Sequence, residues 1–163
     1  MNTRMPVNKK EEFVYTVFMV VFMALIMLSY NVILRNGLSM ESIKIAWLGF
    51  PLTFVVAFLI EWFIVGKFGM ALAFKILKED DPVFKKILII PLLIVSGMVT
   101  FMSLYGAVLT VGFSAELPRE WLNNMGLNFI VAYPLQVLIA RPVVSFIFRK
   151  IFPVGTITVP VRV

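Results

Sequence analysis

The sequence contains neither cysteine nor histidine. The chain therefore forms no disulfide and offers no thiolate or imidazole to a zinc ion or a haem. Ser–His and Cys–His catalytic pairs and a histidine proton relay are excluded as well. The carboxylates form no cluster with the spacing of an oxygen-ligand metal site. We expect no metal ion, no cofactor and no enzymatic activity.

Charge is also scarce, because charged residues make up only 15% of the 163 residues while hydrophobic residues make up 61%. A soluble domain is about half apolar and about a quarter charged. The mean hydropathy of +0.97 points the same way. Such a chain cannot cover its apolar surface in water, so we predict an integral membrane protein whose main partner is the lipid bilayer. The net charge of +6 is more typical of cytoplasmic Lys and Arg than of nucleic-acid binding.

The sequence repeats itself, since residue n resembles residue n + 75 over nearly the whole length. Gly37-Leu38-Ser39 matches Gly112-Phe113-Ser114, and Tyr30 matches Tyr105. A self-match at a fixed offset indicates a duplicated structural unit. Each unit here has the pattern of a pair of membrane helices.

Four apolar stretches have membrane-spanning length. They cover about residues 13–34, 45–65, 87–111 and 121–140. The fold class predicted is an all-α membrane protein with four transmembrane helices in two tandem helix-pair repeats. The predicted boundaries are 1–78 for the first repeat, 83–152 for the second and 153–163 for a short cytoplasmic tail.

Glycine and proline mark the expected ends and irregularities of these helices. Gly37 and Gly112 are natural helix terminators, and Ser39 is a candidate N-cap of the second helix, with Ser42 as a second candidate. Pro51 is expected within the first turns of its helix, whereas Pro134 is interior and predicts a kink.

An apolar segment at residues 70–77 follows the second predicted span. One straight helix continued to its end would be about 50 Å long, well beyond the ~30 Å hydrocarbon core. We therefore expect an interfacial segment or a helix that protrudes into the cytoplasm.

Basic residues are divided unequally between the two ends of the predicted helices. The chain termini and the central link carry 12 of the 15 Lys and Arg residues, and the two hairpin loops carry 3. The positive-inside rule then predicts that both termini lie in the cytoplasm. We expect a multi-pass protein of a bacterial cytoplasmic membrane. The two repeats are parallel, related by an axis along the membrane normal, unlike the inverted repeats of many transporters.

A stripe of small and polar residues follows the second helix of each repeat at four-residue spacing. It comprises Gly49, Thr53, Ala57, Glu61 and Val65 in the first repeat and Asn124, Asn128, Ala132, Gln136 and Ala140 in the second. This spacing keeps the side chains on one slowly rotating helix face. Small and polar residues allow close, hydrogen-bonded helix contacts in lipid. The stripe predicts a packing seam between the repeats or, alternatively, the lining of a polar cavity.

The third helix carries a second face of small residues, at alternating steps of four and three. Its members are Ser96, Thr100, Ser103, Ala107 and Thr110. We interpret this heptad face as helix packing.

Glu61 is the only acidic residue well inside a predicted span. A carboxylate there is costly unless it is neutral or paired, which makes it a candidate carrier of a cation or proton. An ion pair with Arg141, or with another basic residue at the cytoplasmic surface, is the alternative. Its repeat partner Gln136 cannot titrate. Arg141 either binds an anionic head group or substrate, or extends its charge to the membrane interface.

The second repeat resembles a bacterial domain-of-unknown-function family of short helix-pair membrane proteins. The resemblance rests on Phe-x-x-Ala-Tyr-Pro, followed by Ala-Arg-Pro-Val, within residues 128–150, and includes Ala132, Tyr133, Pro134, Arg141 and Pro142. The first repeat departs from this pattern at Phe58, Leu59, Gly66 and Lys67. The resemblance implies two tandem copies and no particular activity. Proteobacterial antimicrobial-compound efflux proteins are similar in architecture only, with tandem helix pairs and a membrane carboxylate.

The function indicated is a small transporter or efflux protein for an amphipathic or cationic compound. Glu61 would take the cation or proton, and Asn124, Asn128 and Gln136 would line its path, with Arg141 near the end. The alternative is a non-catalytic membrane subunit or scaffold that packs against a partner protein or lipid. Because four helices leave little room for a private cavity, a homodimer is also expected.

Overall fold

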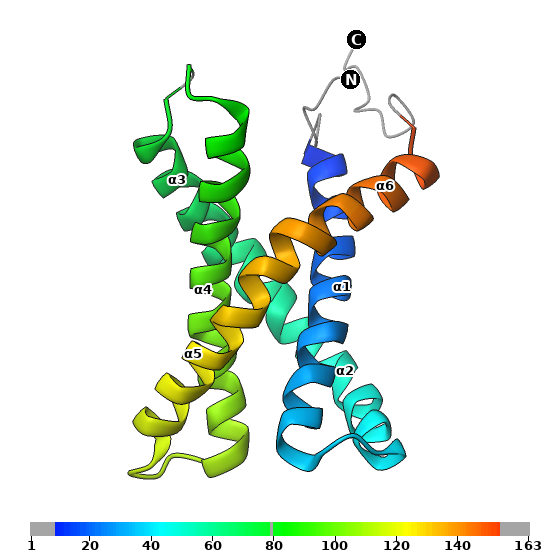
Figure 1. Ribbon diagram of the computed structural model, residues 1–163, viewed down its shortest axis with the longest axis vertical. Helices are drawn as coiled ribbons and strands as arrows, with labels where there is room; N and C mark the ends of the chain where they lie inside the picture. The colour runs from blue at the N-terminus through cyan, green and yellow to red at the C-terminus, as the bar shows by residue number, and fades with distance from the viewer. Residues whose placement is uncertain (1–8, 79, 154–163) are drawn as a thin grey trace.

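The computed structural model of the chain describes residues 9–78 and 80–153, and these residues form four long helical rods (Figure 1). The rods are α1 (Lys9–Asn36); α2 (Met40–Ile60), η1 (Glu61–Val65) and α3 (Gly66–Ile76); α4 (Val83–Val111); and α5 (Leu117–Pro134), η2 (Leu135–Ala140) and α6 (Arg141–Ile151). All four are long and apolar enough to cross a membrane. The predicted all-helical membrane fold of two tandem helix pairs is confirmed. Arg4, Arg162 and most of the predicted tail lie outside the described residues.

The helix boundaries follow the 75-residue offset closely. Residues 66–76 of α3 correspond to residues 141–151 of α6, and a π-helical segment precedes each of them. Gly37 and Gly112 end the first helix of each pair with φ angles of 76° and 63°, a region that favours glycine. The duplication therefore extends from the sequence to the backbone path.

The hairpin loops form one end of the molecule, the hairpin end, and the described chain ends form the other, the terminal end (Figure 1). In the first loop, Ser39 caps α2 by accepting a hydrogen bond from the Ser42 N–H at 3.1 Å. Ser42 donates its own hydroxyl to the Gly37 carbonyl at 2.7 Å. The predicted N-cap is confirmed, and both hydroxyls hold the turn in place.

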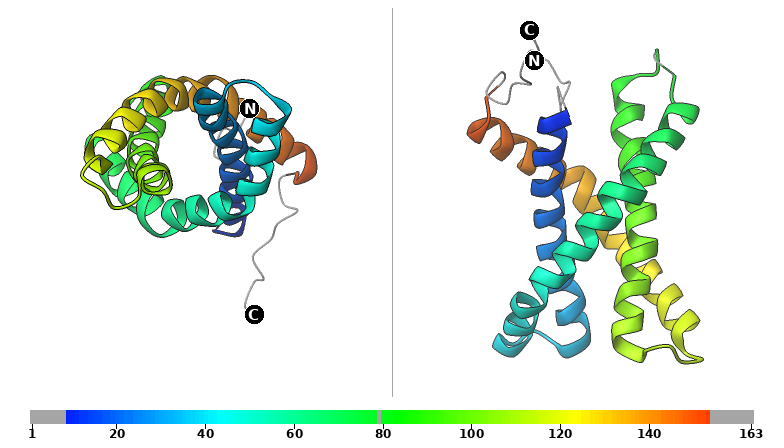
Figure 2. Two further views of the ribbon diagram at one scale, coloured as in Figure 1. Left: turned by 90° about the horizontal axis from the view of Figure 1, so that it is seen from below. Right: turned by 180° about the vertical axis from the view of Figure 1, so that it is seen from behind.

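The second rod of each repeat crosses from its own repeat to the other one (Figures 1 and 2). Near the hairpin end α2 packs on α1 and α5 packs on α4, whereas near the terminal end α3 packs on α4 and α6 packs on α1. A four-residue step turns a side chain by about 40° around an α-helix. The stripe thus faces one neighbour at one end of the rod and another neighbour at the other end.

This crossing changes two expectations about the second rod. The predicted span ended at residue 65, but the helix begins at Met40 and continues through η1 and α3 to Ile76. Pro51 therefore lies about three turns inside α2 rather than in its first turns. Residues 66–76 are packed on α4 rather than set apart as an interfacial segment. The physical reason is inclination, because a tilted helix needs more residues to cover the same depth.

The contact between α1 and α6, the α1–α6 crossing, is ionic and aromatic. Arg149 donates from Nη1 and Nη2 to the two carboxylate oxygens of Glu11 at 3.2 and 3.1 Å. Glu11 is buried, and the fully buried Phe148 ring meets Tyr15 edge-on at 5.6 Å between centroids. The Tyr15 and Ser145 hydroxyls add a hydrogen bond at 3.1 Å.

The contact between α3 and α4, the α3–α4 crossing, depends instead on the absence of side chains. A Cβ on Gly97 would lie 2.9 Å from Val65 Cγ1, and a Cβ on Gly69 would lie 3.3 Å from Ile94 Cγ1. Ala73 is buried one turn further along α3. The two rods therefore approach closely at small residues.

The buried face of α4 shares Ser103 and Ala107 with the predicted heptad face, but not Ser96, Thr100 or Thr110. It follows four-residue spacing and comprises Pro91, Val95, Val99, Ser103 and Ala107. Ser96, which was predicted to pack, is exposed, and Thr100 is partly buried. Ser96 donates its hydroxyl to the Leu92 carbonyl and Thr100 to the Ser96 carbonyl, both at 2.7 Å. The helix itself satisfies the Ser96 hydroxyl, whereas Thr100 Oγ1 also contacts Met125 Sδ of α5 at 3.8 Å.

Candidate functional site

A cavity of about 530 Å³ lies between the two repeats. It is enclosed by α1, α2, η1, α4, α5 and η2, which surround the long axis of the molecule (Figure 2). The volume falls within the range of small-molecule binding sites. One chain surrounds this space by itself, so a second copy is not needed to build a cavity and the physical reason for expecting a homodimer does not hold.

The stripe predicted on the second and fourth rods lines this cavity. The lining members are Thr53, Ala57, Glu61, Asn124, Asn128, Ala132 and Gln136. Gly49 instead lies against α1, where a Cβ would be 3.9 Å from Leu28 Cδ2. Val65 and Ala140 continue the stripe as buried residues. The stripe is therefore both a buried helix face and a cavity wall, and the two interpretations offered by the sequence apply to the same residues.

Methionines supply much of the remaining wall. Met23 and Met27 of α1 and their repeat equivalents Met98 and Met102 of α4 line the cavity, together with Met19. The thioether side chain is flexible and polarisable, and it packs against ligands of different shape. The wall is thus apolar and adaptable, with few polar groups.

Glu61 and its repeat equivalent Gln136 line the cavity from the two π-helical turns. In each turn a backbone N–H bonds five residues back, from Gly66 to Glu61 and from Arg141 to Gln136. Pro134 directly precedes the second turn, but the non-proline Leu59 occupies the same place before the first. A proline is therefore not required for this irregularity. Single π-helical turns occur frequently at functional sites.

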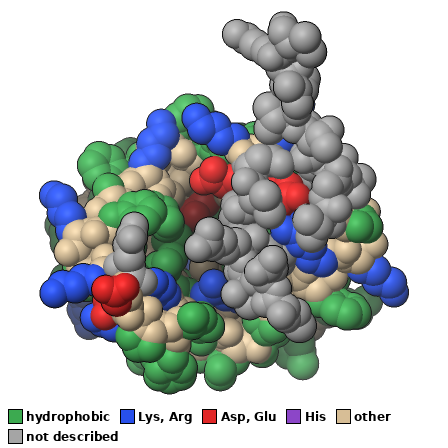
Figure 3. All heavy atoms as spheres, turned by 90° about the horizontal axis from the view of Figure 1, so that it is seen from above, with side chains coloured by type: hydrophobic (Ala, Val, Ile, Leu, Met, Phe, Trp, Pro, Cys, Tyr) green, Lys and Arg blue, Asp and Glu red, His purple; other side chains and the backbone are tan. Residues whose placement is uncertain are grey.

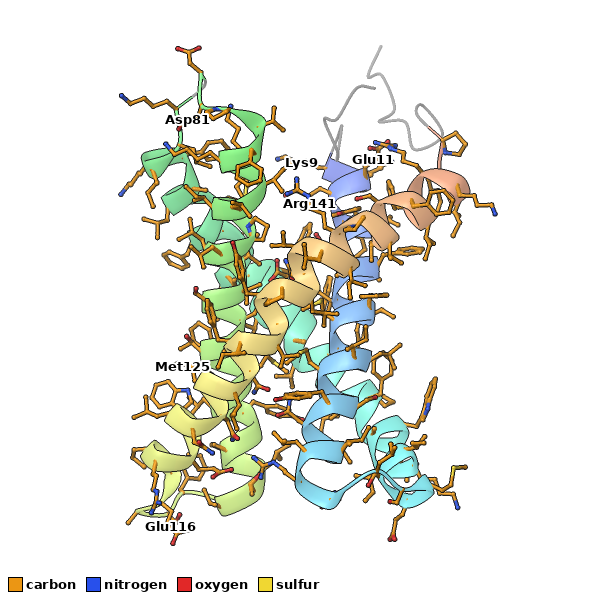
Figure 4. All side chains as sticks on the ribbon, viewed as in Figure 1. Lys9, Glu11, Asp81, Glu116, Met125 and Arg141 are labelled. Carbon is orange, nitrogen blue, oxygen red and sulfur yellow. The ribbon has the colours of Figure 1, made fainter. Side chains whose placement is uncertain are left out.

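The Glu61 carboxylate has no ion-pair partner among residues 9–78 and 80–153. The pair with Arg141 that the sequence suggested as an alternative is not formed. Arg141 begins α6, does not line the cavity, and lies toward the terminal end (Figure 4). Five residues separate it from Gln136, so it lies more than one helical turn beyond the level of Glu61. A charged carboxylate on an apolar wall is costly, so the Glu61 carboxyl group is either protonated or paired with a bound cation.

Arg35 extends across the cavity at its hairpin end. Its guanidinium donates to Thr110 Oγ1 at 2.7 Å, to Glu120 Oε1 at 2.7 Å and to Asn124 Oδ1 at 3.1 Å. Thr110 is the repeat equivalent of Arg35, so a direct contact between them places both close to the axis that relates the repeats. This cluster joins α1 of the first repeat to α4 and α5 of the second.

From the sequence, Arg35 was predicted only as one of the basic residues of the hairpin loops, and Glu120 was not predicted as a site residue. The available signal was the offset itself, because it pairs Arg35 with Thr110 at the end of a buried helix face. Asn124, a predicted site residue, belongs to this cluster and also donates to Glu120 Oε1 at 3.3 Å.

Asn128 lies one turn further into the cavity and is 7% exposed. Its Nδ2–H donates to Ser103 Oγ at 3.0 Å. Its Oδ1 is buried and accepts no hydrogen bond from the part of the chain that the structure describes. Buried acceptors are almost always satisfied, so Asn128 Oδ1 is an exception among the buried side-chain atoms of the described residues.

The face at the terminal end is hollowed between the rods (Figure 3). Lysine and arginine side chains are spread around the rim of this hollow, acidic side chains lie at the hollow and on the rim as well, and apolar side chains lie within it. Basic side chains therefore surround this end of the molecule with acidic ones among them, whereas at the hairpin end Arg35 pairs with Glu120.

The family model for a domain of unknown function, DUF2798, matches residues 8–77 and again residues 84–152. The chain belongs to this family and contains two tandem copies of its domain. It is also 33% identical over 150 residues to "Uncharacterized protein YybC" of Bacillus subtilis (strain 168), a match that covers 90% of this chain and 94% of that protein. No solved structure gives a significant match.

Proposed function

From the site alone, since the function of the family is unknown, we propose that this protein is a small non-enzymatic membrane transporter for amphipathic organic cations. The observation that carries the proposal is the unpaired Glu61 carboxylate on the wall of an otherwise mostly apolar cavity. The methionine wall would hold the apolar part of such a compound, and Glu61 its charge. Gln136 would complete the polar end from the opposite repeat.

The orientation that we propose places the terminal end in the cytoplasm of a bacterium. The rim of lysine and arginine side chains at that end supports this assignment through the positive-inside rule. The Arg35 cluster then closes the outer end of the cavity. Transport outward would require the contacts of Arg35 with Thr110 and Glu120 to separate.

The test is uptake of a lipophilic cationic dye by proteoliposomes that contain the purified protein. Replacing Glu61 with Gln removes the charge and keeps the size, so we expect at least about tenfold weaker dye binding and slower uptake. Glu116→Gln is the matched control, because Glu116 is exposed in the second hairpin loop, far from the cavity (Figure 4).

Equal dye binding by wild type and Glu61→Gln would reject this role of Glu61. If the wild-type protein neither binds nor moves the dye, and purification from native membranes recovers a stoichiometric partner, the chain is instead a non-transporting membrane subunit. Mass measurements in detergent would show whether it forms a homodimer.

A further inference from the structure

The charge of Glu61 depends on what occupies the cavity. Its side chain lines the cavity, and its carboxyl group forms no ion pair or hydrogen bond with the side chains of residues 9–78 and 80–153. The wall around it is mostly apolar, and a lone charge in such a place is costly. An empty cavity therefore favours the protonated carboxyl group, whereas a cation in contact with it favours the carboxylate.

No basic side chain of the described residues is placed to neutralise Glu61 in the way that a bound cation would. Two other titratable side chains face the cavity, Arg35 from α1 and Tyr105 from α4, and none comes from α2, α3, α5 or η2. Arg35 is paired with Glu120 at the hairpin end, and a phenol carries no positive charge. Lys67, the nearest basic residue along the chain, is exposed and does not line the cavity. The charge that balances the Glu61 carboxylate must therefore come from the ligand.

Gln136 places an uncharged counterpart of Glu61 on the opposite wall. The two π-helical segments η1 and η2 are repeat equivalents, and their rods pass on opposite sides of the long axis (Figures 1 and 2). Both side chains line the same cavity, and an amide does not ionise. The two turns therefore form one shared site with a single ionisable group, which balances one positive charge at a time.

We propose that Glu61 exchanges one proton for each monovalent organic cation that the protein binds. The O–H bond of the carboxyl group breaks, its electron pair stays on the carboxylate oxygen, the proton passes to water, and the cation takes its place. The site is thus neutral both with and without ligand. When the site opens to each side of the membrane in turn, a proton gradient drives the cation in the opposite direction. This inference rests on the proposed function, because it requires that Glu61 binds the cation.

The experiment counts the protons released when tetraphenylphosphonium is added to the purified protein in weakly buffered detergent solution. This probe has a permanent positive charge and no proton to lose. We expect wild type to release about one proton per bound probe at pH 6, and its affinity to fall roughly tenfold for each further unit of decrease in pH. Glu61→Gln should release none. Glu116→Gln, which changes a carboxyl group in the exposed second hairpin loop, should match wild type.

Exchanging the two side chains tests the shared site. Glu61→Gln combined with Gln136→Glu moves the carboxyl group to the equivalent turn of the other repeat. This swapped protein should recover both the binding of the probe and the release of the proton that Glu61→Gln lacks. A swapped protein that is folded but recovers neither would show that the two turns do not form one site.

Three further results would overturn the inference in distinguishable ways. If wild type binds the probe and releases no proton, the exchange is wrong while the transporter proposal stands. If Glu61→Gln binds the probe and releases a proton as wild type does, another group carries the exchange. If wild type binds neither the probe nor the dye, the proposed function itself fails. The proton count of wild type decides the exchange even if a variant does not fold.

Discussion

The α1–α6 and α3–α4 crossings are repeat-related contacts with opposite chemistry. The first contains a buried ion pair between Glu11 and Arg149. The offset places Lys86 and Phe74 at the corresponding positions of the second, where Phe74 is exposed. The aromatic ring of Phe148 is buried in the first crossing, whereas the repeat-equivalent residue that is buried in the second crossing is the much smaller Ala73.

This difference shows that the duplicated backbone path does not depend on one particular interface. The same crossing is stabilised by paired charges and a ring on one side and by close backbone approach on the other. A buried ion pair must be balanced against its desolvation, whereas small residues gain contact without burying charge. The two crossings should therefore respond to different substitutions.

The largest effect is expected at the ion pair. Replacing Arg149 with Ala leaves the buried Glu11 carboxylate without its bidentate partner, and we expect a loss of about 3 kcal/mol in the free energy of unfolding. Denaturant unfolding in detergent, followed by circular dichroism, measures it. Lys150→Ala is the control, because Lys150 is adjacent and exposed. Equal losses in both variants would mean that the pair contributes nothing specific.

A smaller effect is expected at the α3–α4 crossing. The Cβ of Gly97→Ala would lie 2.9 Å from Val65 Cγ1, so the rods must move apart, at a cost of about 1–2 kcal/mol. Gly106→Ala on the same helix is the control. A Cβ there meets nothing within 4 Å, so alanine should be neutral or should stabilise the helix by up to about 1 kcal/mol.

The cause of that loss can be tested with a double variant. Val65→Ala removes the Cγ atoms that oppose the new methyl group. In the Gly97→Ala background it should therefore cost less than it does in wild type. A purely additive result would place the strain elsewhere.

The helices and their pairing were predictable because hydropathy and the offset are local signals. Glycine ended the first helix of each pair, and the Ser39 cap formed as its sequence position predicts. The exchange of neighbours at the crossings was not predictable, because periodicity defines which face of a rod is buried but not which rod covers it. The inclined, longer helices follow from this exchange.

The candidate site was predictable only in part. The stripe identified seven cavity-lining residues, including Glu61, because the wall of a narrow cavity and a packing seam share the same spacing. The Arg35 cluster joins residues that are 75 to 89 positions apart, and the offset indicates only its contact with Thr110, not those with Glu120 and Asn124. Of the predicted face of α4, Ser103 and Ala107 are buried, whereas Ser96 is exposed because the Leu92 carbonyl satisfies its hydroxyl.

The smallest effect is expected at the exposed link beside the α3–α4 crossing, where Asp81 joins the end of α3 to α4. Hydrogen bonds from the Lys78 N–H at 2.8 Å and from Lys85 Nζ at 2.9 Å lower the pKa of Asp81. A lowered pKa stabilises the folded state above the unfolded pKa of about 3.9, and this contribution disappears as the pH falls through the folded-state value.

Asp81→Asn should therefore lower stability slightly at pH 6, and the difference from wild type should shrink as the pH falls below about 4. The loss should be far below that of Arg149→Ala, because solvent screens exposed pairs. Unfolding midpoints of both proteins between pH 6 and pH 3 measure it. A loss at pH 6 as large as that of Arg149→Ala would mean that the link, rather than the small residues Gly69, Ala73 and Gly97, stabilises the α3–α4 crossing.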